Sequence, residues 1–368
     1  MTHLASILLL SFLELLCSPL DSVDLLFAGD AMQHAAQNVA ARQGNGTYDY
    51  SECFALLEPY IQSADYAVVN LECPLGGRPY TGYPCFSAPD EFGWQLRKSG
   101  FDLILTANNH CLDRRDAGLR RTVAKLDEMK IPHIGTYLNA AARNRQLPFM
   151  VNLKGMKVAF LDYTYGTNGI PVQKDVVVDH IDLRQMETDI NAARDAGAQV
   201  LCVCLHWGVE YTLSPVKEQK DLAQWLVDRG VDLIIGGHPH VVEPFKVVRS
   251  DAYDKDVLVV YSLGNFISNQ KPVDTRGGAM VKVTLKVENG KPVVRNPRYR
   301  LFFCQHPSGR GDNYRLIPEN MPEKVRRDSK PMFNQFMSRT HDLVMSKNSG
   351  VSHDKRAPLI PHHPDAPF

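Results

Sequence analysis

Short apolar segments that end abruptly on glycine or a polar side chain recur along this chain and alternate with amphipathic segments. Apolar runs bounded in this way are typical of buried strands, whereas apolar residues spaced three and four apart predict helices. The predicted strands are residues 23–28, 66–71, 101–106, 158–163, 200–205, 231–235 and 257–262, and the predicted helices are residues 118–130, 182–196 and 217–229. This alternation predicts a layered α/β fold.

The most informative strand end is at residues 231–240, where Ile234 and Ile235 lead into two glycines and then His238-Pro239-His240. Proline disfavours the helical conformation in the residue before it, so we expect His238 to be extended. The two imidazoles, two positions apart, would then point the same way, as two ligands of one metal centre must. The alternative is a surface turn in which both histidines are incidental.

Other predicted strands end on polar side chains of the same kinds, and these residues are Asp30, Glu72, Asn109 with His110, and His206. Because ligands bind beyond the carboxyl ends of strands in α/β sheets, we expect these groups to converge. Carboxylate, amide oxygen and imidazole together suit zinc, manganese or iron, and the absence of a thiolate argues against a structural zinc site. A bridging carboxylate between two ligand sets would hold two ions.

Six motifs in this order resemble the capsule-synthesis CapA (poly-γ-glutamate biosynthesis) family, which is similar to the calcineurin-like metallophosphoesterases. They are Gly29-Asp30, Asn70-Leu71-Glu72, Asn108-Asn109-His110, His206-Trp207-Gly208-Val209-Glu210-Tyr211, Gly237-His238-Pro239-His240 and Tyr261-Ser262-Leu263-Gly264-Asn265-Phe266. The resemblance covers residues 23–285 and implies an α/β/β/α sandwich of two mixed sheets flanked by helices. It also implies a metal-dependent hydrolase or transferase with two divalent ions (Mn, Fe or Zn).

The resemblance implies a role for each matching position. The implied metal ligands are Asp30 and His240 for the first ion, Glu72 as the bridge, and Asn109, His206 and His238 for the second ion. His110 would meet the substrate and protonate or stabilise the leaving group, with Asp113 orienting its far ring nitrogen. Candidate substrate contacts are Glu210, Asn265 and Tyr165. The structural alternatives are a helix cap for Asp30, a turn for Asn109 and a hydrogen-bonded histidine for His110.

Two departures from the phosphoesterase pattern bear on activity. Those enzymes begin with G-D-x-H, whereas here the nearest histidine after Asp30 is His34, four positions on. The bridge is Glu72 instead of an aspartate, one methylene longer. Besides the hydrolase, we therefore retain a non-catalytic component of capsule assembly or export that keeps the fold, and a general phosphoesterase.

The net charge of the chain and the chemistry of the implied substrate limit the kinds of partner that we expect. Lysine plus arginine equals aspartate plus glutamate, 41 each, so no excess basic charge points to nucleic acid. The expected substrate is an anionic polymer or a phosphoester, and a capsule-synthesis membrane complex is an expected partner. Cys73 and Cys85 flank a loop and would pair only in an oxidising compartment.

We expect different structures at the two ends of the chain. Residues 4–16 form an apolar run of signal-peptide length, interrupted by Glu14, so residues 1–20 are either a signal peptide or an N-terminal helix. Export or association with the cell envelope is favoured over the cytoplasm. Residues 21–305 form the predicted CapA-like domain, in which alternation over 278–294 and an Asn289-Gly290 step predict a β-hairpin. Residues 306–368 are predicted to be a C-terminal extension, partly disordered and loosely packed, with a solvated His353.

Overall fold

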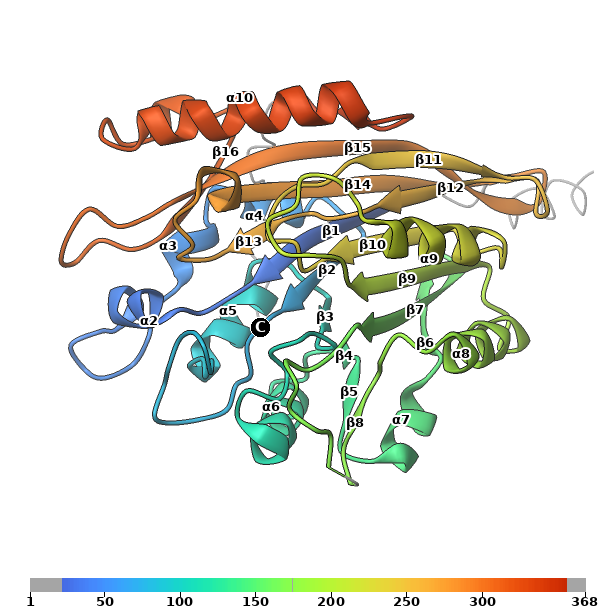
Figure 1. Ribbon diagram of the computed structural model, residues 1–368, viewed down its shortest axis with the longest axis horizontal. Coiled ribbons are helices and arrows are strands. Elements are labelled where there is room, and N and C mark those ends of the chain that lie inside the picture. Colours follow the sequence, from blue (N-terminus) through green and yellow to red (C-terminus); the bar gives the residue numbers. More distant parts are fainter. Residues whose placement is uncertain (1–21, 174, 356–368) are drawn as a thin grey trace, which may run out of the picture.

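The computed structural model describes residues 22–173 and 175–355, which form two β-sheets packed face to face with helices outside them (Figure 1). Side-chain alternation explains the layers. In β1 (Val23–Ala31), Leu25 and Phe27 face the core between the sheets, whereas Leu26 and Ala28 face helices. The α/β/β/α sandwich that the resemblance implied is confirmed.

The first sheet has nine strands among the described residues, in the order β16-β15-β14-β1-β2-β3-β4, with β13 beside β1 and β17 beside β15. Their bounds are β2 Tyr66–Leu71, β3 Leu103–Leu105, β4 His133–Ile134, β13 Asn265–Ile267, β14 Gly277–Glu288, β15 Lys291–Gln305, β16 Arg315–Pro318 and β17 Ser352–His353. Because β1, β2 and β3 are parallel, their carboxyl ends meet at one edge.

The second sheet has six strands in the described chain, in the order β11-β12-β10-β9-β7-β6. Their bounds are β6 Phe149–Leu153, β7 Met156–Thr164, β9 Val200–His206, β10 Leu233–Gly237, β11 Phe245–Ser250 and β12 Lys255–Val260. Strands β7, β9, β10 and β12 are parallel. A short antiparallel pair, β5 (Thr136–Tyr137) and β8 (Val177–Val178), lies apart from both sheets.

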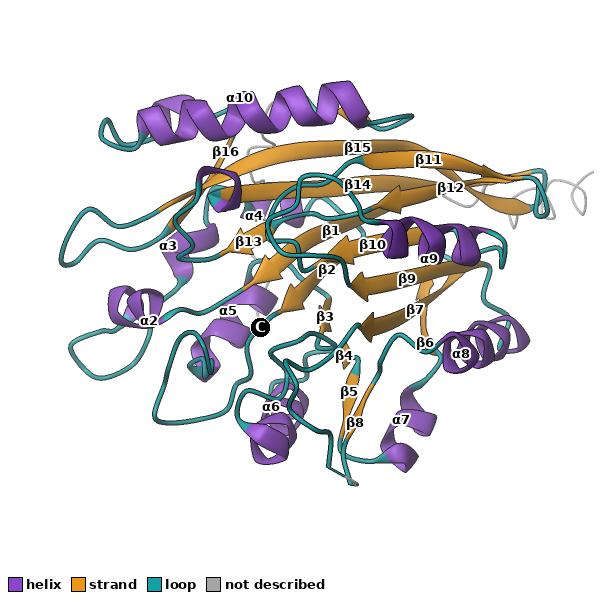
Figure 2. Ribbon diagram, in the orientation of Figure 1, coloured by secondary structure: helices purple, strands orange, loops and turns teal. Residues whose placement is uncertain are grey.

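Helices cover both outer faces of the sandwich (Figure 2). The helices are α2 Ala35–Ala41, α3 Ser51–Phe54, α4 Glu58–Ile61, α5 Asp90–Lys98, α6 Arg115–Glu128, α7 Ala140–Gln146, α8 Leu183–Asp195, α9 Lys217–Val227 and α10 Lys330–Lys347, with 3₁₀ turns η1 Val273–Thr275 and η2 Pro322–Lys324. Side chains of α3, α4 and α5 pack on the first sheet, and those of α8 and α9 pack on the second. Among the described residues, none of these helices is both long enough and apolar enough to cross a bilayer.

The predicted hairpin is confirmed. Strands β14 and β15 pair antiparallel, and both residues of the connecting turn have positive φ, 52° at Asn289 and 77° at Gly290. This is the backbone that a two-residue hairpin turn requires, and asparagine and glycine adopt it readily.

The expectation of loose packing after residue 305 is wrong for residues 306–355. Strand β16 extends the first sheet beside β15, and α10 buries Phe333 and Phe336 against Phe303. The physical reason is that the polar composition hid an amphipathic helix with one apolar face. His353 is also only partly exposed instead of fully solvated, and its Nε2 lies 2.7 Å from Glu319 Oε1.

Two smaller expectations concern the cysteines and the N-terminus. Cys73 is buried, Cys85 is exposed, and both are free thiols in the described chain. The signal peptide or N-terminal helix predicted for residues 1–20 lies outside the described residues.

Candidate metal centre

The six predicted metal ligands come together where strands of both sheets end. Ligand atoms of five of them form two groups that share Glu72, one with Asp30 and His240 and the other with His206 and His238, and Asn109 contacts His206. Within each group the ligand atoms lie within 4.8 Å of one another. All six residues are at most 3% exposed. Residues separated by more than 200 positions therefore form one buried constellation.

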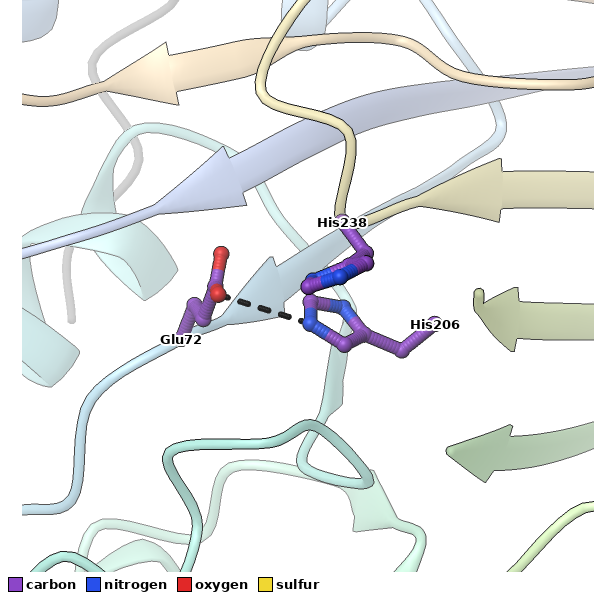
Figure 3. Close-up of side chains that lie close together, drawn as sticks. All are labelled: Glu72, His206 and His238. Atoms are coloured by element: carbon purple, nitrogen blue, oxygen red, sulfur yellow. Dashed lines mark ion pairs between the residues drawn. The ribbon is translucent and has the colours of Figure 1, made fainter. Parts of the chain in front are cut away.

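Glu72 and His206 face each other beside His238 (Figure 3). His206 Nε2 lies 3.4 Å from Glu72 Oε1 and 2.9 Å from Asn109 Oδ1. The ring centroids of His206 and His238 are 4.8 Å apart. A carboxylate oxygen, an amide oxygen and two imidazoles thus lie close together, as the resemblance implied for the second ion.

The other group is built around His240. Its Nδ1 lies 3.6 Å from Asp30 Oδ2, 3.8 Å from Glu72 Oε2 and 3.0 Å from Asn265 Oδ1. Asn265 is fully buried, and its amide also donates to Thr275 O and Gln270 Oε1. The structure therefore places Asn265 against a metal-ligand candidate as a positioning residue.

The residues present fit divalent cations. Both oxygens of Glu72, and Nδ1 of His238, are buried with no hydrogen-bond partner among the described residues. A buried carboxyl group without hydrogen bonds is destabilising, and polar groups left this way in native folds commonly serve a ligand. Two triads of hard and borderline donors around one such carboxylate are what a two-ion site requires.

Burial and neighbouring charges set the protonation of this set. Burial together with the charge of Asp30 raises the pKa of Glu72 to about 8. Burial lowers the pKa of His206 to about 3 and also lowers the pKa of His238, so both rings are neutral. Burial disfavours charge on His240 too, but Glu72 and Asp30 outweigh it and raise its pKa to about 9. His206 and His238 are thus in the neutral form that binds metals, whereas His240 must release a proton when an ion binds.

His110 and Asp113 form the predicted dyad. His110 Nδ1 lies 2.8 Å from Asp113 Oδ2, and that oxygen also accepts the backbone N–H of Phe86 at 2.7 Å. Burial lowers the pKa of His110, but the hydrogen bond to Asp113 and the charge of Glu72 raise it above its usual value overall. The ring is thus held by its far nitrogen and favours the protonated state.

The extended conformation expected for His238 is wrong. Its φ is 97°, and that of His240 is 60°, so both residues occupy the left-handed region. A contact distant in sequence explains this backbone, because the His238 N–H donates to Asp30 Oδ2 at 3.0 Å. A Cβ on Gly237 would lie 2.7 Å from Asp30 Oδ1, so glycine permits the close approach. The rings still lie together, with centroids 6.0 Å apart.

Sequence reasoning missed the amides that support the ligands. Asn70 Nδ2 donates to Asp30 Oδ1 at 2.7 Å and lies 3.3 Å from His206 Nδ1. Asn108 in turn donates to Asn70 Oδ1 at 3.0 Å. Both asparagines stand beside predicted ligands at strand ends, which is the signal that could have identified them.

A buried acid and a buried amide were also missed. Asp162, an acid inside the predicted strand 158–163, accepts the N–H groups of Thr106 and Ala107 and so fixes the start of the loop that carries Asn109. Gln33 is fully buried, and neither atom of its amide has a hydrogen-bond partner among the residues described. It lies three positions beyond Asp30.

The histidine of the G-D-x-H pattern is replaced in this chain, and the structure shows where the replacing residue lies. Met32 occupies the histidine position and is buried in the core beneath the helices. The histidine four positions after Asp30, His34, has Nδ1 3.1 Å from Gln37 Oε1 and 3.2 Å from the N–H of Asn269. His34 belongs to neither metal-ligand group.

Tyr165 and Glu210 lie at the exposed margin of the constellation. The Tyr165 ring centroid is 4.6 Å from that of His238, and the residue is 47% exposed. Glu210 is exposed, and its charge acts on the pKa of His206 and of Tyr211. Their places suit the substrate contacts that the sequence predicted.

The fold and the site together define an α/β/β/α sandwich protein with a candidate metal centre of carboxylates and histidines at its strand ends. More narrowly, the chain belongs to the bacterial capsule synthesis protein family PGA_cap, whose family model matches residues 24–270.

Two relatives are capsule proteins. "Capsule biosynthesis protein CapA" of Bacillus anthracis is 28% identical over 288 residues, covering 74% of this chain and 66% of that protein. "PGA biosynthesis protein CapA" of Bacillus subtilis (strain 168) is 26% identical over 291 residues, covering 73% and 69%. The alignments therefore span about two thirds of the length of these relatives.

Solved structures with a similar chain trace include an NAD nucleotidase and a calcineurin-like phosphoesterase. NAD nucleotidase of Haemophilus influenzae matches with a TM-score of 0.49 at 12% identity, covering 92% of this chain and 65% of that one. A calcineurin-like phosphoesterase of Bacillus subtilis matches with a TM-score of 0.44 at 12% identity, covering 87% and 97%.

Proposed function

We propose that this protein is a metal-dependent hydrolase or transferase with a two-ion site, acting in the synthesis of a capsule or a poly-γ-glutamate type surface polymer. The observation that carries the proposal is the position of Glu72, which is fully buried, lacks a hydrogen-bond partner among the described residues and is shared by two ligand triads. Membership of the capsule synthesis family and the names of the relatives support the biological setting.

Two divalent ions at these triads would supply Lewis acidity and activate water at neutral pH. The chain's own residues would do the remaining work. His110, held by Asp113, would give a proton to the leaving group, and Tyr165 and Glu210 would contact the substrate at the margin. The substrate would be a phosphoester or an amide of an anionic polymer. Neutral net charge does not oppose such a substrate, because bound cations dominate the local field.

We also propose a cellular location and a partner for this protein. A capsule polymer is assembled at the cell envelope, so we place the protein there, in contact with a membrane complex of capsule synthesis. The apolar run at residues 4–16 supports this placement.

Metal content tests the site. We expect wild-type protein to hold about two more ions per chain than Glu72→Ala, since Glu72 serves both triads, and His238→Ala to lose at least one. Elemental analysis after equilibration with manganese, iron or zinc gives the count, and Glu218→Ala, an exposed glutamate, is the matched control. Equal metal content in all four proteins would rule out the two-ion site.

A second candidate is a non-catalytic assembly component, favoured by Met32 at the expected histidine position. Hydrolysis separates the two candidates. The hydrolase should cleave aryl phosphates or γ-glutamyl amides, and His110→Ala should lower kcat by about 10²-fold or more, as expected for loss of a general acid. Full metal occupancy without turnover of either substrate would favour the assembly role. Turnover of many unrelated phosphoesters would favour a general phosphoesterase.

A further inference from the structure

Three polar side chains of the C-terminal segment converge on one another, and none belongs to the strand-end site. Glu319 directly follows β16, His341 lies in α10 and His353 lies in β17. His341 Nε2 lies 2.8 Å from Glu319 Oε2, and His353 Nε2 lies 2.7 Å from Glu319 Oε1. The two imidazole centroids are 4.9 Å apart. Three separate elements thus present three ligand atoms to one point.

These side chains are held in place by their surroundings. Glu319 Oε1 accepts the N–H of Leu301 at 3.0 Å, and the Glu319 N–H donates to Leu301 O at 3.0 Å. The His353 ring stacks on Tyr299, with centroids 5.1 Å apart and planes 13° apart. Orienting contacts of this kind are what a metal ligand needs from the residues behind it.

The cluster is accessible from solvent, unlike the strand-end site. The side chains of Glu319, His341 and His353 are 9%, 28% and 23% exposed. A hydrated ion can therefore reach the ligand atoms, and water can complete its coordination. Two imidazoles and one carboxylate are a standard set of three protein ligands for zinc, with a fourth position left to water.

We propose that Glu319, His341 and His353 bind one Zn²⁺ ion, separately from the ions of the strand-end site. Ligand atoms of a tetrahedral zinc site lie about 3.3 Å apart, so each nitrogen–oxygen pair would open by about 0.5 Å. The two histidine side chains, which are partly exposed, can rotate by that amount. The bound ion would replace two hydrogen bonds and fasten α10 and β17 to the strand that precedes Glu319.

Zinc binding by full-length protein in the Glu72→Ala background tests the proposal, because this change disables the strand-end site. We expect that protein to bind about one Zn²⁺ per chain in equilibrium dialysis, and the added changes His341→Ala and His353→Ala to abolish it. Zinc at about 100 times Kd should raise Tm by about 3 °C or more in the first protein and leave the second unmoved. Asp342→Ala, an exposed neighbour on α10, is the matched control.

A fold defect is separated from a ligand defect by Glu319→Gln, which is nearly isosteric. This variant should keep its metal-free Tm within about 1 °C and lose zinc binding at least 10-fold, since an amide oxygen is a poorer ligand than a carboxylate. If zinc binding and the zinc-dependent Tm rise are unchanged in these variants, the cluster is a hydrogen-bonded structural contact only and the proposal is overturned. The outcome does not depend on whether the strand-end site binds metal.

Discussion

Glu243 is a buried carboxyl in the segment between β10 and β11, beside Gln219 of α9. It is fully buried, its Oε2 accepts Gln219 Nε2 at 2.8 Å, and its Oε1 has no partner among the described residues. Burial raises its pKa to about 7, with the Gln219 hydrogen bond opposing the shift. This single residue therefore couples stability to pH near neutrality.

The sign of that coupling follows from the two protonation states. In the unfolded chain Glu243 loses its proton near pH 4.5, whereas in the folded chain it keeps the proton to about pH 7. Between these values the folded state binds more protons, so stability falls as pH rises and stays low above pH 7. We expect Glu243→Gln to raise the free energy of unfolding at pH 8 by about 1 to 3 kcal/mol, and hardly at pH 4.5.

Urea denaturation at both pH values measures the effect of Glu243→Gln. Glu218→Gln, at an exposed position on the same helix as Gln219, is the control and should show no pH-dependent gain. An equal gain for Glu243→Gln at pH 4.5 and pH 8 would contradict a role for the carboxyl's titration.

For individual residues, the sequence predicted which side chains form the candidate metal centre but not the backbone conformation that positions them. Asp30, Glu72 and His206 could be found because each follows an apolar run that had to be a strand. The positive φ of His238 could not, because it depends on a hydrogen bond to a residue 208 positions away. Asn70 was passed over because an asparagine has no chemistry of its own to reveal that it orients Asp30.

Among the elements, α10 departs furthest from expectation. Its polar composition masks buried positions at Phe333, Phe336, Met337 and Val344, whose spacing follows one helical face. A pattern so diluted by polar residues is recognisable only when the surface it covers is known. Here that surface is the end of β15 at Phe303.

Truncation of α10 at its buried face should be costly. Phe336 is fully buried, so we expect Phe336→Ala to lower the free energy of unfolding by about 3 kcal/mol or more, through lost burial and a cavity. Chemical denaturation measures it. Met345→Ala, on the same helix at 80% exposure, should change stability by less than about 0.5 kcal/mol. Similar small effects for both variants would show that α10 is not part of the core.

At the scale of the whole molecule, the candidate metal centre joins the two sheets. Asp30 lies near the end of β1 and Glu72 directly follows β2 in the first sheet, whereas His206 ends β9 and His238 directly follows β10 in the second. The strands and the layered fold were predictable from local pattern. Assignment of each strand to its sheet was not, because β1 joins β14 by pairing residues more than 250 positions apart.

Removal of metal should therefore weaken the sandwich as a whole. We expect a chelator to lower the Tm of the loaded wild-type protein by about 5 °C or more, because ions bound at both triads favour the folded state. Calorimetry with and without chelator measures this, and the decrease should be much smaller in Glu72→Ala. A chelator effect of the same size in both proteins would place the stabilising ions elsewhere.

Residues 348–353 connect the open edges of both sheets. Ser349 exchanges two backbone hydrogen bonds with β11 of the second sheet, and β17 pairs with β15 of the first. These residues leave the ribosome after every other described strand. A nascent chain can thus assemble both sheets and all six predicted metal ligands before the contacts of Ser349 with β11 and of β17 with β15 have formed. Formation of the bridge between these two sheet edges is consequently a late event of synthesis, and a chain stalled or cut before residue 348 would carry the ligands without it.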